Sequence, residues 1–199
     1  MNKIGILNLQ GAVSEHLAMT KKAINKMDIS CQADVVRYND EVDKCDGIII
    51  SGGESTVIGK LIRERRIDES LKENEIPVFG TCAGMVLMSK KTDHDQDVFN
   101  MIPMEVERNS FGSQKNSFEK EIEILGSSFH GIFIRAPVVK KICNENLNGV
   151  DNVEILSKID NKIIAVKQNK NIALSFHPEL TEDTRLHEYY LKEVLDIKF

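Results

Sequence analysis

One cysteine set between two glycines constrains this chain more than any other feature. The sequence Gly80-Thr81-Cys82-Ala83-Gly84 lies where a short apolar run, residues 76–79, gives way to the apolar residues 85–88. The first run is typical of a buried strand and the second of a helix start, so the glycines predict a sharp strand-to-helix turn with Cys82 at its tip. A Cβ at either glycine would collide with the crossing helix or strand. Most lone cysteines are buried and structural, so a reactive Cys82 requires a base and an orienting acid elsewhere in the chain.

The composition bounds the kind of protein that this is. With 199 residues, of which 41% are hydrophobic and 29% charged, the chain is long enough for one well-buried α/β domain, and we expect residues 1–199 to form a single domain. A net charge of −5 without a Lys/Arg cluster gives no attraction to nucleic acid or to an anionic membrane. The first apolar segment is too short for a signal sequence or a membrane span. The four cysteines form no C-x-x-C pair, which favours a reducing, cytoplasmic location without disulfides.

The order of the apolar segments predicts the fold class. Strands are expected at residues 3–9, 33–37, 47–50 and 76–79, and helices at residues 14–27, 56–66 and 68–73. The third strand is apolar without alternation, as expected when helices cover both faces of a sheet. Strands that alternate with helices in this way indicate a doubly wound parallel α/β sheet.

Apolar positions at three- and four-residue steps predict which helix faces are buried. In the first helix this stripe consists of Val13, Leu17, Thr20, Ile24 and Met27. Ser14 is the expected N-cap of that helix, and His16, which lies off the stripe, is interpreted as a solvated histidine. In the helix at residues 56–66, Val57 and Leu61 are expected to face inward, and Ile58 and Ile62 are further candidates for the buried face.

From residue 92 the character of the chain changes. Residues 92–97 are polar with a D-x-D-x-D pattern, but Met104 stands where a calcium loop has its distal glutamate, so we interpret them as a surface loop and expect no metal site. Short strands are expected at residues 104–108, 119–125, 129–134, 153–157, 162–167 and 171–176, the last three joined by hairpin turns. Thr181 is expected to cap a final helix that ends at residue 195.

Several residues with chemical potential lie at the ends of predicted strands. Gly52 and Gly53 directly follow the strand at residues 47–50, and they form either a simple turn or a backbone donor site for an anion. Ligands bind at the carboxyl ends of the strands in open parallel sheets, which favours the second interpretation. Arg108 and Arg135 each end a strand, and the sequence leaves open whether they are surface arginines or carboxylate anchors.

A candidate base and acid follow the last strand as His177-Pro178-Glu179. Proline keeps the residue before it out of the helical region, and side chains two apart in an extended segment point to the same side. Glu179 can therefore reach the ring nitrogen that His177 does not offer to Cys82, as the third member of a catalytic triad does. A core histidine and a helix-flanking glutamate are the alternatives for these residues taken singly.

Together, the cysteine turn and the His-Pro-Glu segment resemble the class I, or triad, glutamine amidotransferase family. Within that family the chain resembles the glutaminase subunits of pyridoxal 5'-phosphate synthases. The resemblance extends over nearly the whole chain through four more motifs, namely Leu9-Gln10-Gly11-Ala12, Gly52-Gly53-Glu54-Ser55-Thr56, Arg108-Asn109-Ser110-Phe111-Gly112 and Phe133-Ile134-Arg135-Ala136-Pro137. Ser51 departs from the family pattern, which usually has proline before the double glycine, and we expect this difference to loosen the turn without affecting the chemistry.

The resemblance implies a fold, an activity and roles for particular residues. The fold is a single-domain three-layer α/β sandwich of the flavodoxin type, with a mostly parallel central sheet, helices on both faces and a small antiparallel extension. The activity is hydrolysis of L-glutamine to L-glutamate and ammonia by a Cys82-His177-Glu179 triad through a thioester, without a cofactor. The implied oxyanion donors are the N–H groups of Gly53 and Ala83. The implied glutamine pocket consists of Gly53, Glu54, Ser55, Arg108, Ile134 and Arg135.

The resemblance also implies a partner. Ammonia would pass to a (β/α)8-barrel synthase subunit that makes pyridoxal 5'-phosphate (vitamin B6), in a hetero-oligomer with Gln10 and Gly52 near the interface. Three alternatives remain open. They are the glutaminase subunit of another biosynthetic amidotransferase, for example that of histidine biosynthesis, a redox protein that uses Cys82 as a peroxide sensor, and an interaction module without activity.

Overall fold

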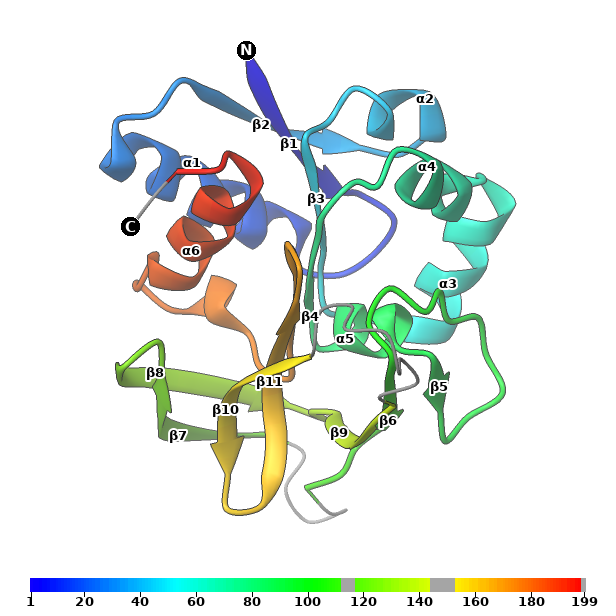
Figure 1. Ribbon diagram of the computed structural model, residues 1–199, viewed down its shortest axis with the longest axis vertical. Helices are drawn as coiled ribbons and strands as arrows, with labels where there is room; N and C mark the ends of the chain where they lie inside the picture. Colours follow the sequence, from blue (N-terminus) through cyan, green and yellow to red (C-terminus); the bar gives the residue numbers. More distant parts are fainter. Residues whose placement is uncertain (112–116, 144–152, 198–199) are drawn as a thin grey trace, which may run out of the picture.

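The computed structural model describes residues 1–111, 117–143 and 153–197. Its centre is a ten-stranded sheet, in which nine strands follow the order β2-β1-β3-β4-β12-β11-β9-β6-β5 and β10 pairs with β11 (Figure 1). Five adjacent strands form the parallel half, namely β2 (Cys31–Val36), β1 (Asn2–Leu7), β3 (Gly47–Ile50), β4 (Val78–Thr81) and β12 (Asn171–Leu174).

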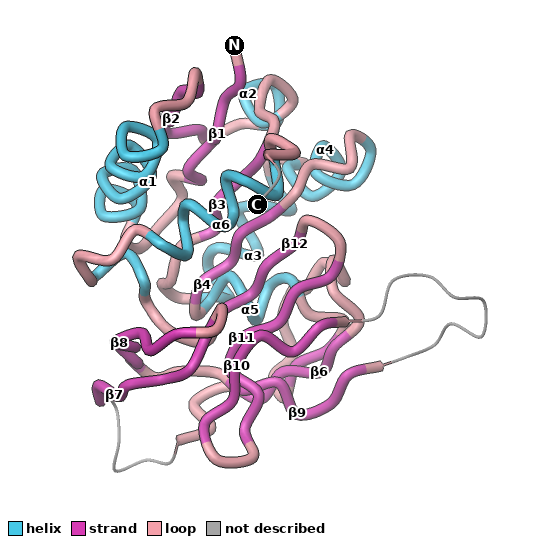
Figure 2. Tube along the Cα trace, turned by 60° about the vertical axis from the view of Figure 1, so that its left-hand side comes forward, coloured by secondary structure: helices cyan, strands magenta, loops and turns pink. Residues whose placement is uncertain are grey.

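The other half of the sheet is mainly antiparallel and lies far from the N-terminus (Figure 2). Its strands are β11 (Lys162–Gln168), β10 (Glu154–Ile159), β9 (Val138–Ile142), β6 (Met104–Glu107) and β5 (Lys91–Thr92). Strand β9 was not predicted from the sequence. Its pairing with β6 skips Lys140, and such a bulge breaks the alternation by which a strand is recognised.

Helices cover both faces of the sheet (Figure 1). One face carries the long helices α1 (Val13–Met27) and α6 (Arg185–Val194). The other face carries α2 (Asn39–Val42), α3 (Ser55–Glu64), α4 (Ile67–Glu73) and α5 (Ala83–Met88). A separate hairpin of β7 (Ser117–Ile124) and β8 (Ser127–Ile134) packs its apolar side into the core of the first face. This arrangement confirms the predicted three-layer α/β architecture with an antiparallel extension.

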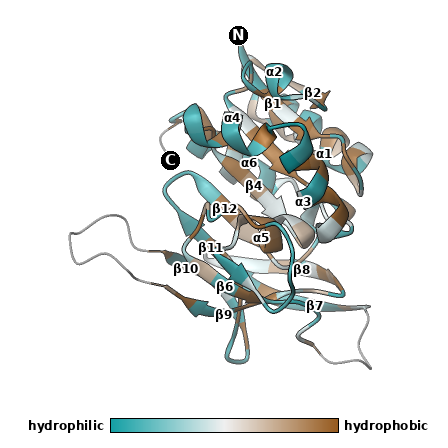
Figure 3. Ribbon diagram, turned by 90° about the vertical axis from the view of Figure 1, so that its right-hand side faces the viewer, coloured by the Kyte–Doolittle hydropathy of each residue, from teal (hydrophilic) through white to brown (hydrophobic). Residues whose placement is uncertain are grey.

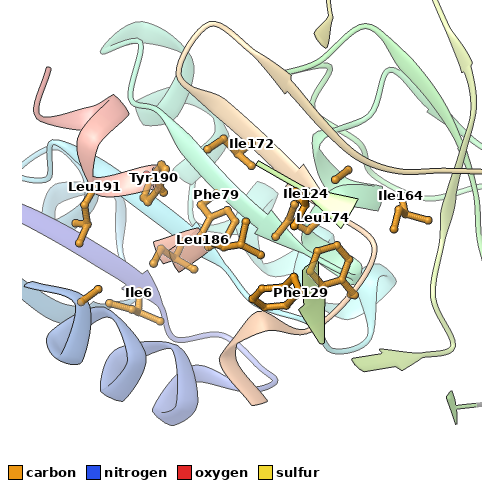
Figure 4. Packing of buried hydrophobic residues seen from close by; sticks show 14 of the residues in the cluster. Ile6, Phe79, Ile124, Phe129, Ile164, Ile172, Leu174, Leu186, Tyr190 and Leu191 are labelled. Carbon is orange, nitrogen blue, oxygen red and sulfur yellow. The ribbon is translucent and has the colours of Figure 1, made fainter. Parts of the chain in front are cut away.

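Alternation along the central strands supplies a hydrophobic core on each side of the sheet. Ile49 and Phe79 face α1 and α6, whereas Ile48 and Val78 face the other four helices. Phe79 stacks on Tyr190 of α6 with ring centroids 5.2 Å apart, near the centre of the packing shown in Figure 4. All six residues of α5 are buried, and Figure 3 shows much of this helix in the hydrophobic colour. No helix in the described part of the chain is both long and apolar enough to span a bilayer.

The buried face of α1 differs from the predicted stripe. His16 is fully buried together with Met19 and Ala23, so the interpretation of His16 as a solvated histidine was wrong. The helix packs against both the sheet and α6, and its buried face is therefore wider than one apolar stripe indicates. Ser14 is not the N-cap, because its hydroxyl bonds to Glu15 and the helix begins one residue earlier.

Two other helix predictions also need correction. In α3, the further candidates Ile58 and Ile62 are buried, whereas Val57 is 43% exposed, so the inward face is centred one residue after the first choice. Thr181 does not cap the last helix, because a single 3-10 turn, η1 (Pro178–Leu180), precedes it and α6 begins at Arg185.

Candidate active site

The parallel register brings three loops together at the carboxyl edge of the sheet. Gly80 of β4 pairs with Ile50 of β3, and Thr81 pairs with Leu174 of β12. The residues that follow these three strands are the double glycine, Cys82 and the His-Pro-Glu segment. Adjacent parallel strands end at the same edge, so segments more than a hundred residues apart in sequence meet there.

Cys82 lies on a strained turn between β4 and α5. Its φ of 50° and ψ of −102° are unusual for a residue with a side chain, and its N–H is held by the Leu174 carbonyl at 2.8 Å. A Cβ on Gly84 would lie 2.3 Å from the Ile50 carbonyl oxygen, and one on Gly80 would lie 2.8 Å from the backbone carbonyl carbon of Gly84. Both glycines are therefore required by backbone crossings, as the sequence predicted.

Glu179 holds the imidazole of His177 from behind. Its Oε1 lies 2.7 Å from Nδ1 of the ring, and the two residues are 5% and 7% exposed. The backbone between them is the 3-10 turn η1 and not an extended segment, so the predicted contact is present on a different local backbone. The backbone N–H of His177 donates to the Ile132 carbonyl at 2.9 Å, which ties the histidine to β8.

Cys82 and His177 face each other across Gly52. A Cβ on Gly52 would lie 2.4 Å from Cε1 of His177 and 3.3 Å from Cβ of Cys82. Nε2 of the ring is buried without a hydrogen-bond partner in the described part of the chain. Burial lowers the pKa of His177, but Cys82 and Glu179 more than offset this and raise it to about 10. The ring therefore holds a proton beside the sulfur at neutral pH.

We expect the His177 ring to titrate near pH 10 in the wild-type chain and at lower pH in Glu179→Gln. A raised pKa means that the protonated ring persists through neutral pH and loses its proton only as the pH rises through about 10. The side-chain amide that replaces the carboxylate in Glu179→Gln carries no charge to hold that proton. The measurement is an NMR titration of the His177 Cε1–H signal, with the exposed His130 as the internal control. A wild-type midpoint near 6.5, or an equal midpoint in both proteins, would contradict the prediction.

A pocket of about 450 Å³ opens in front of the sulfur. It is lined by all six residues of the predicted glutamine pocket together with Cys82, Ala83, Val86, Asn109, Pro137 and His177. Its volume falls within the usual range of small-molecule sites. Glu54 provides a carboxylate, and Arg108 and Arg135 provide guanidinium groups, so the pocket offers both charges that a free amino acid requires.

The two predicted oxyanion donors border the same pocket. Ala83 is the first residue of α5, where the backbone N–H has no partner within the helix. Gly53 has a φ of 154°. The carbonyl oxygen of the preceding residue, Gly52, points at Gly11, because it would lie 1.6 Å from a Cβ built on Gly11. The N–H of a trans peptide points opposite to its carbonyl, so the Gly53 N–H points away from Gly11.

Gln10 and Ser51 hold the glycine loop against the loop after β1. The Glu54 N–H donates to Oε1 of Gln10 at 2.8 Å, and the Ser51 hydroxyl donates to the Gln10 carbonyl at 3.1 Å. Ser51 is only 1% exposed. The hydroxyl therefore adds a tie between the two loops at the position where the family usually has proline.

The structure also brings forward two residues that the sequence analysis missed. Gln96, in the predicted surface loop, accepts hydrogen bonds at Oε1 from the Ser55 hydroxyl at 3.0 Å and from Nη1 of Arg108 at 2.6 Å. It thus fixes two side chains of the pocket from behind. His16 lies 3.3 Å from Glu179. Neither residue belongs to a motif, and no local pattern in the sequence indicates these contacts.

The fold and the site define the class of protein, and comparison with known proteins gives the same class. Residues 6–196 match the SNO glutamine amidotransferase family, and the chain belongs to that family. A solved structure described as a glutamine amidotransferase superimposes with a TM-score of 0.83 at 39% identity, over 96% of this chain and 98% of that one.

Individual relatives carry a more particular name. The chain is 58% identical to the pyridoxal 5'-phosphate synthase subunit PdxT of Methanobrevibacter smithii over 196 residues, which is 98% of each chain. It is 53% identical to the protein of the same name from Methanothermobacter thermautotrophicus, again over 98% of each chain.

Proposed function

We propose that this chain is a glutaminase that hydrolyses L-glutamine to L-glutamate and ammonia and supplies the ammonia to pyridoxal 5'-phosphate synthesis in the cytoplasm. The observation that carries this proposal is the pocket that places Cys82 and His177 beside groups of both charges, with Glu179 2.7 Å behind the imidazole. The resemblance to PdxT subunits over 98% of the chain supports the particular pathway.

The proposed reaction begins with attack of the Cys82 sulfur, as thiolate, on the side-chain amide carbon of glutamine. The N–H groups of Gly53 and Ala83 donate hydrogen bonds to the amide oxygen and stabilise the negative charge that develops on it. His177 gives its proton to the amide nitrogen, the C–N bond breaks, and ammonia leaves. Water then loses a proton to His177 and attacks the γ-glutamyl thioester, which releases glutamate and restores the sulfur. The reaction requires no cofactor or metal.

The charges in the pocket suit the other end of the substrate. All three charged residues line the pocket, and we assign Arg108 and Arg135 to the α-carboxylate and Glu54 to the α-ammonium. Gln96 holds the Arg108 guanidinium in position, which lowers the conformational entropy lost when the substrate binds. Ile134 and Val86 provide apolar surface for the two methylene groups.

The proposed partner is a barrel synthase subunit in a hetero-oligomer, because free ammonia would otherwise be lost to water. Gln10 and the Gly52–Gly53 peptide belong to the two tied loops beside the pocket, and we propose that docking adjusts this peptide. Neither nucleic acid nor a membrane is part of the proposal.

We expect the complex with the barrel subunit to release glutamate from glutamine much faster than the chain alone. The measurement is glutamate release with and without that subunit, together with a pull-down that identifies the barrel. Equal rates would contradict activation by docking. Capture of a different synthase would favour another amidotransferase.

A diazoketone analogue of glutamine should label Cys82, and glutamine should block this labelling. Absence of labelling would favour the peroxide sensor.

A further inference from the structure

The acid of the candidate triad is itself backed by two buried histidines. His16 of α1 and His187 of α6 are both fully buried, and Nδ1 of His16 lies 3.0 Å from Nε2 of His187. On its other side, Nε2 of His16 lies 3.0 Å from Oγ1 of Thr81 and 3.3 Å from Oε2 of Glu179. His16 therefore touches the residue before the nucleophile and the carboxylate behind the base.

The surroundings of both rings favour the neutral form of the imidazole. Burial, followed by the neighbouring His187 and His177, holds the pKa of His16 well below its usual value, and burial lowers the pKa of His187 to about 3. The other groups that face His16 are the Thr81 hydroxyl, the Glu179 carboxylate and the ring of Phe79, 6.3 Å away. A neutral imidazole has one N–H and one lone pair, so the contact between the two rings uses one proton and allows two arrangements.

In the first arrangement, His187 donates from Nε2 to Nδ1 of His16, whose own proton is then on Nε2 and points at Thr81 and Glu179. In the second, His16 donates from Nδ1, and its Nε2 lone pair faces the Glu179 carboxylate. Nδ1 of His187 has no partner in the described part of the chain. This nitrogen carries only a lone pair in the first arrangement but a buried, unpaired N–H in the second. Buried N–H groups without partners are rare, so the first arrangement is favoured.

Glu179 favours the same arrangement. Its Oε1 accepts from His177, whereas Oε2 has no hydrogen-bond partner within the described residues, and Nε2 of His16 lies 3.3 Å from Oε2. A buried carboxylate oxygen that faces a lone pair would be repelled, and one that faces an N–H is stabilised.

We propose that His16 and His187 are positioning residues for the triad. His187 fixes the tautomer of His16, and the Nε2–H of His16, 3.3 Å from Oε2, stabilises the charge of the Glu179 carboxylate that supports the His177 imidazole. The inference rests on the proposed function in that Glu179 orients a catalytic base. It adds two buried histidines, from two helices far apart in sequence, to the three residues of the candidate triad.

The test uses the full chain in complex with the barrel subunit. In His16→Ala we expect the kcat for glutamine hydrolysis to fall about tenfold with KM within about twofold, the loss usual when a partner that orients a reacting group is removed. His187→Ala should lower kcat by a smaller factor than His16→Ala does, again with KM within about twofold. His16→Gln should restore much of the rate, because its side-chain amide can again donate to Glu179.

Tyr190→Phe is the matched control on α6. It removes buried hydrogen bonds to the Ile48 and Pro77 carbonyls without touching the triad. We expect it to lower Tm and leave kcat unchanged. A His16→Ala variant with wild-type kcat, or a His16→Gln variant as slow as His16→Ala, would overturn the proposal.

Two further measurements do not depend on turnover. Nitrogen NMR of the wild-type rings should show the Nε2–H tautomer for both histidines, and an Nδ1–H tautomer of His16 would overturn the proposal even if the alanine variants fail to fold.

Iodoacetamide should alkylate Cys82 more slowly at pH 7 in His16→Ala, because weaker support of the His177 imidazolium leaves less thiolate. If this slowing is seen but the wild-type complex does not hydrolyse glutamine, the proposed function fails while the positioning role stands. If the complexes are active and both alkylation and kcat are unchanged in His16→Ala, the proposed function stands and the positioning role fails.

Discussion

Replacement Cys82→Ala is expected to abolish glutamine hydrolysis while leaving the complex with the barrel subunit intact. The thioester cannot form without the sulfur, and removal of a catalytic nucleophile typically lowers kcat by about a thousandfold or more. The side chain is only partly buried on the turn, so its loss leaves a small cavity and little change in stability. The measurements are glutamate release by the complex and co-elution of the two subunits.

Cys31→Ala is the control for this experiment. Cys31 lies on the edge strand β2, and burial raises the pKa of its thiol, so it is a poor nucleophile and its loss should leave the rate unchanged. If Cys82→Ala lost both the activity and the complex, Cys82 would be a structural cysteine and the proposed mechanism would fail.

Replacement Gly84→Ala is expected to destabilise the turn and to remove most of the activity. Alanine is the better helix former by about 1 kcal/mol, but its Cβ would lie 2.3 Å from the Ile50 carbonyl oxygen, which is backbone of a central strand and cannot move aside. Overpacking of this kind costs about 1–3 kcal/mol, so the clash outweighs the gain. The turn must shift, and a displacement of about 1 Å at the reacting group costs about a hundredfold in rate.

The measurements for this variant are Tm and the kcat of the complex. Gly126→Asn provides a control, because Gly126 has a φ of 73° and no atom of the described residues lies within 4 Å of where its Cβ would stand. Asparagine tolerates that backbone conformation, so this variant should retain wild-type activity. A Gly84→Ala protein as stable and as active as the wild type would show that the strand can yield, and the account of the strained turn would be wrong.

Much of the candidate site could be predicted because its signals are local. A glycine is required wherever backbones cross, so the two glycines around Cys82 were enough to indicate a turn. The ends of apolar segments indicated the carboxyl edge of the sheet. The pocket residues were implied by the family resemblance, and the structure places them around one cavity at that edge. The catalytic roles assigned to them stay predictions until the variants are measured.

Most of the strands and helices, the turn that presents the sulfur and the residues that follow each parallel strand can be read from the sequence. These features depend on hydrophobic period and on backbone restrictions, which act over a few residues. Only the folded chain reveals that His16 is buried against Glu179 and His187, and that Gln96 reaches Arg108. Such contacts join segments up to 171 residues apart, and a polar side chain becomes buried only when other segments supply its hydrogen-bond partners, which no local pattern can show.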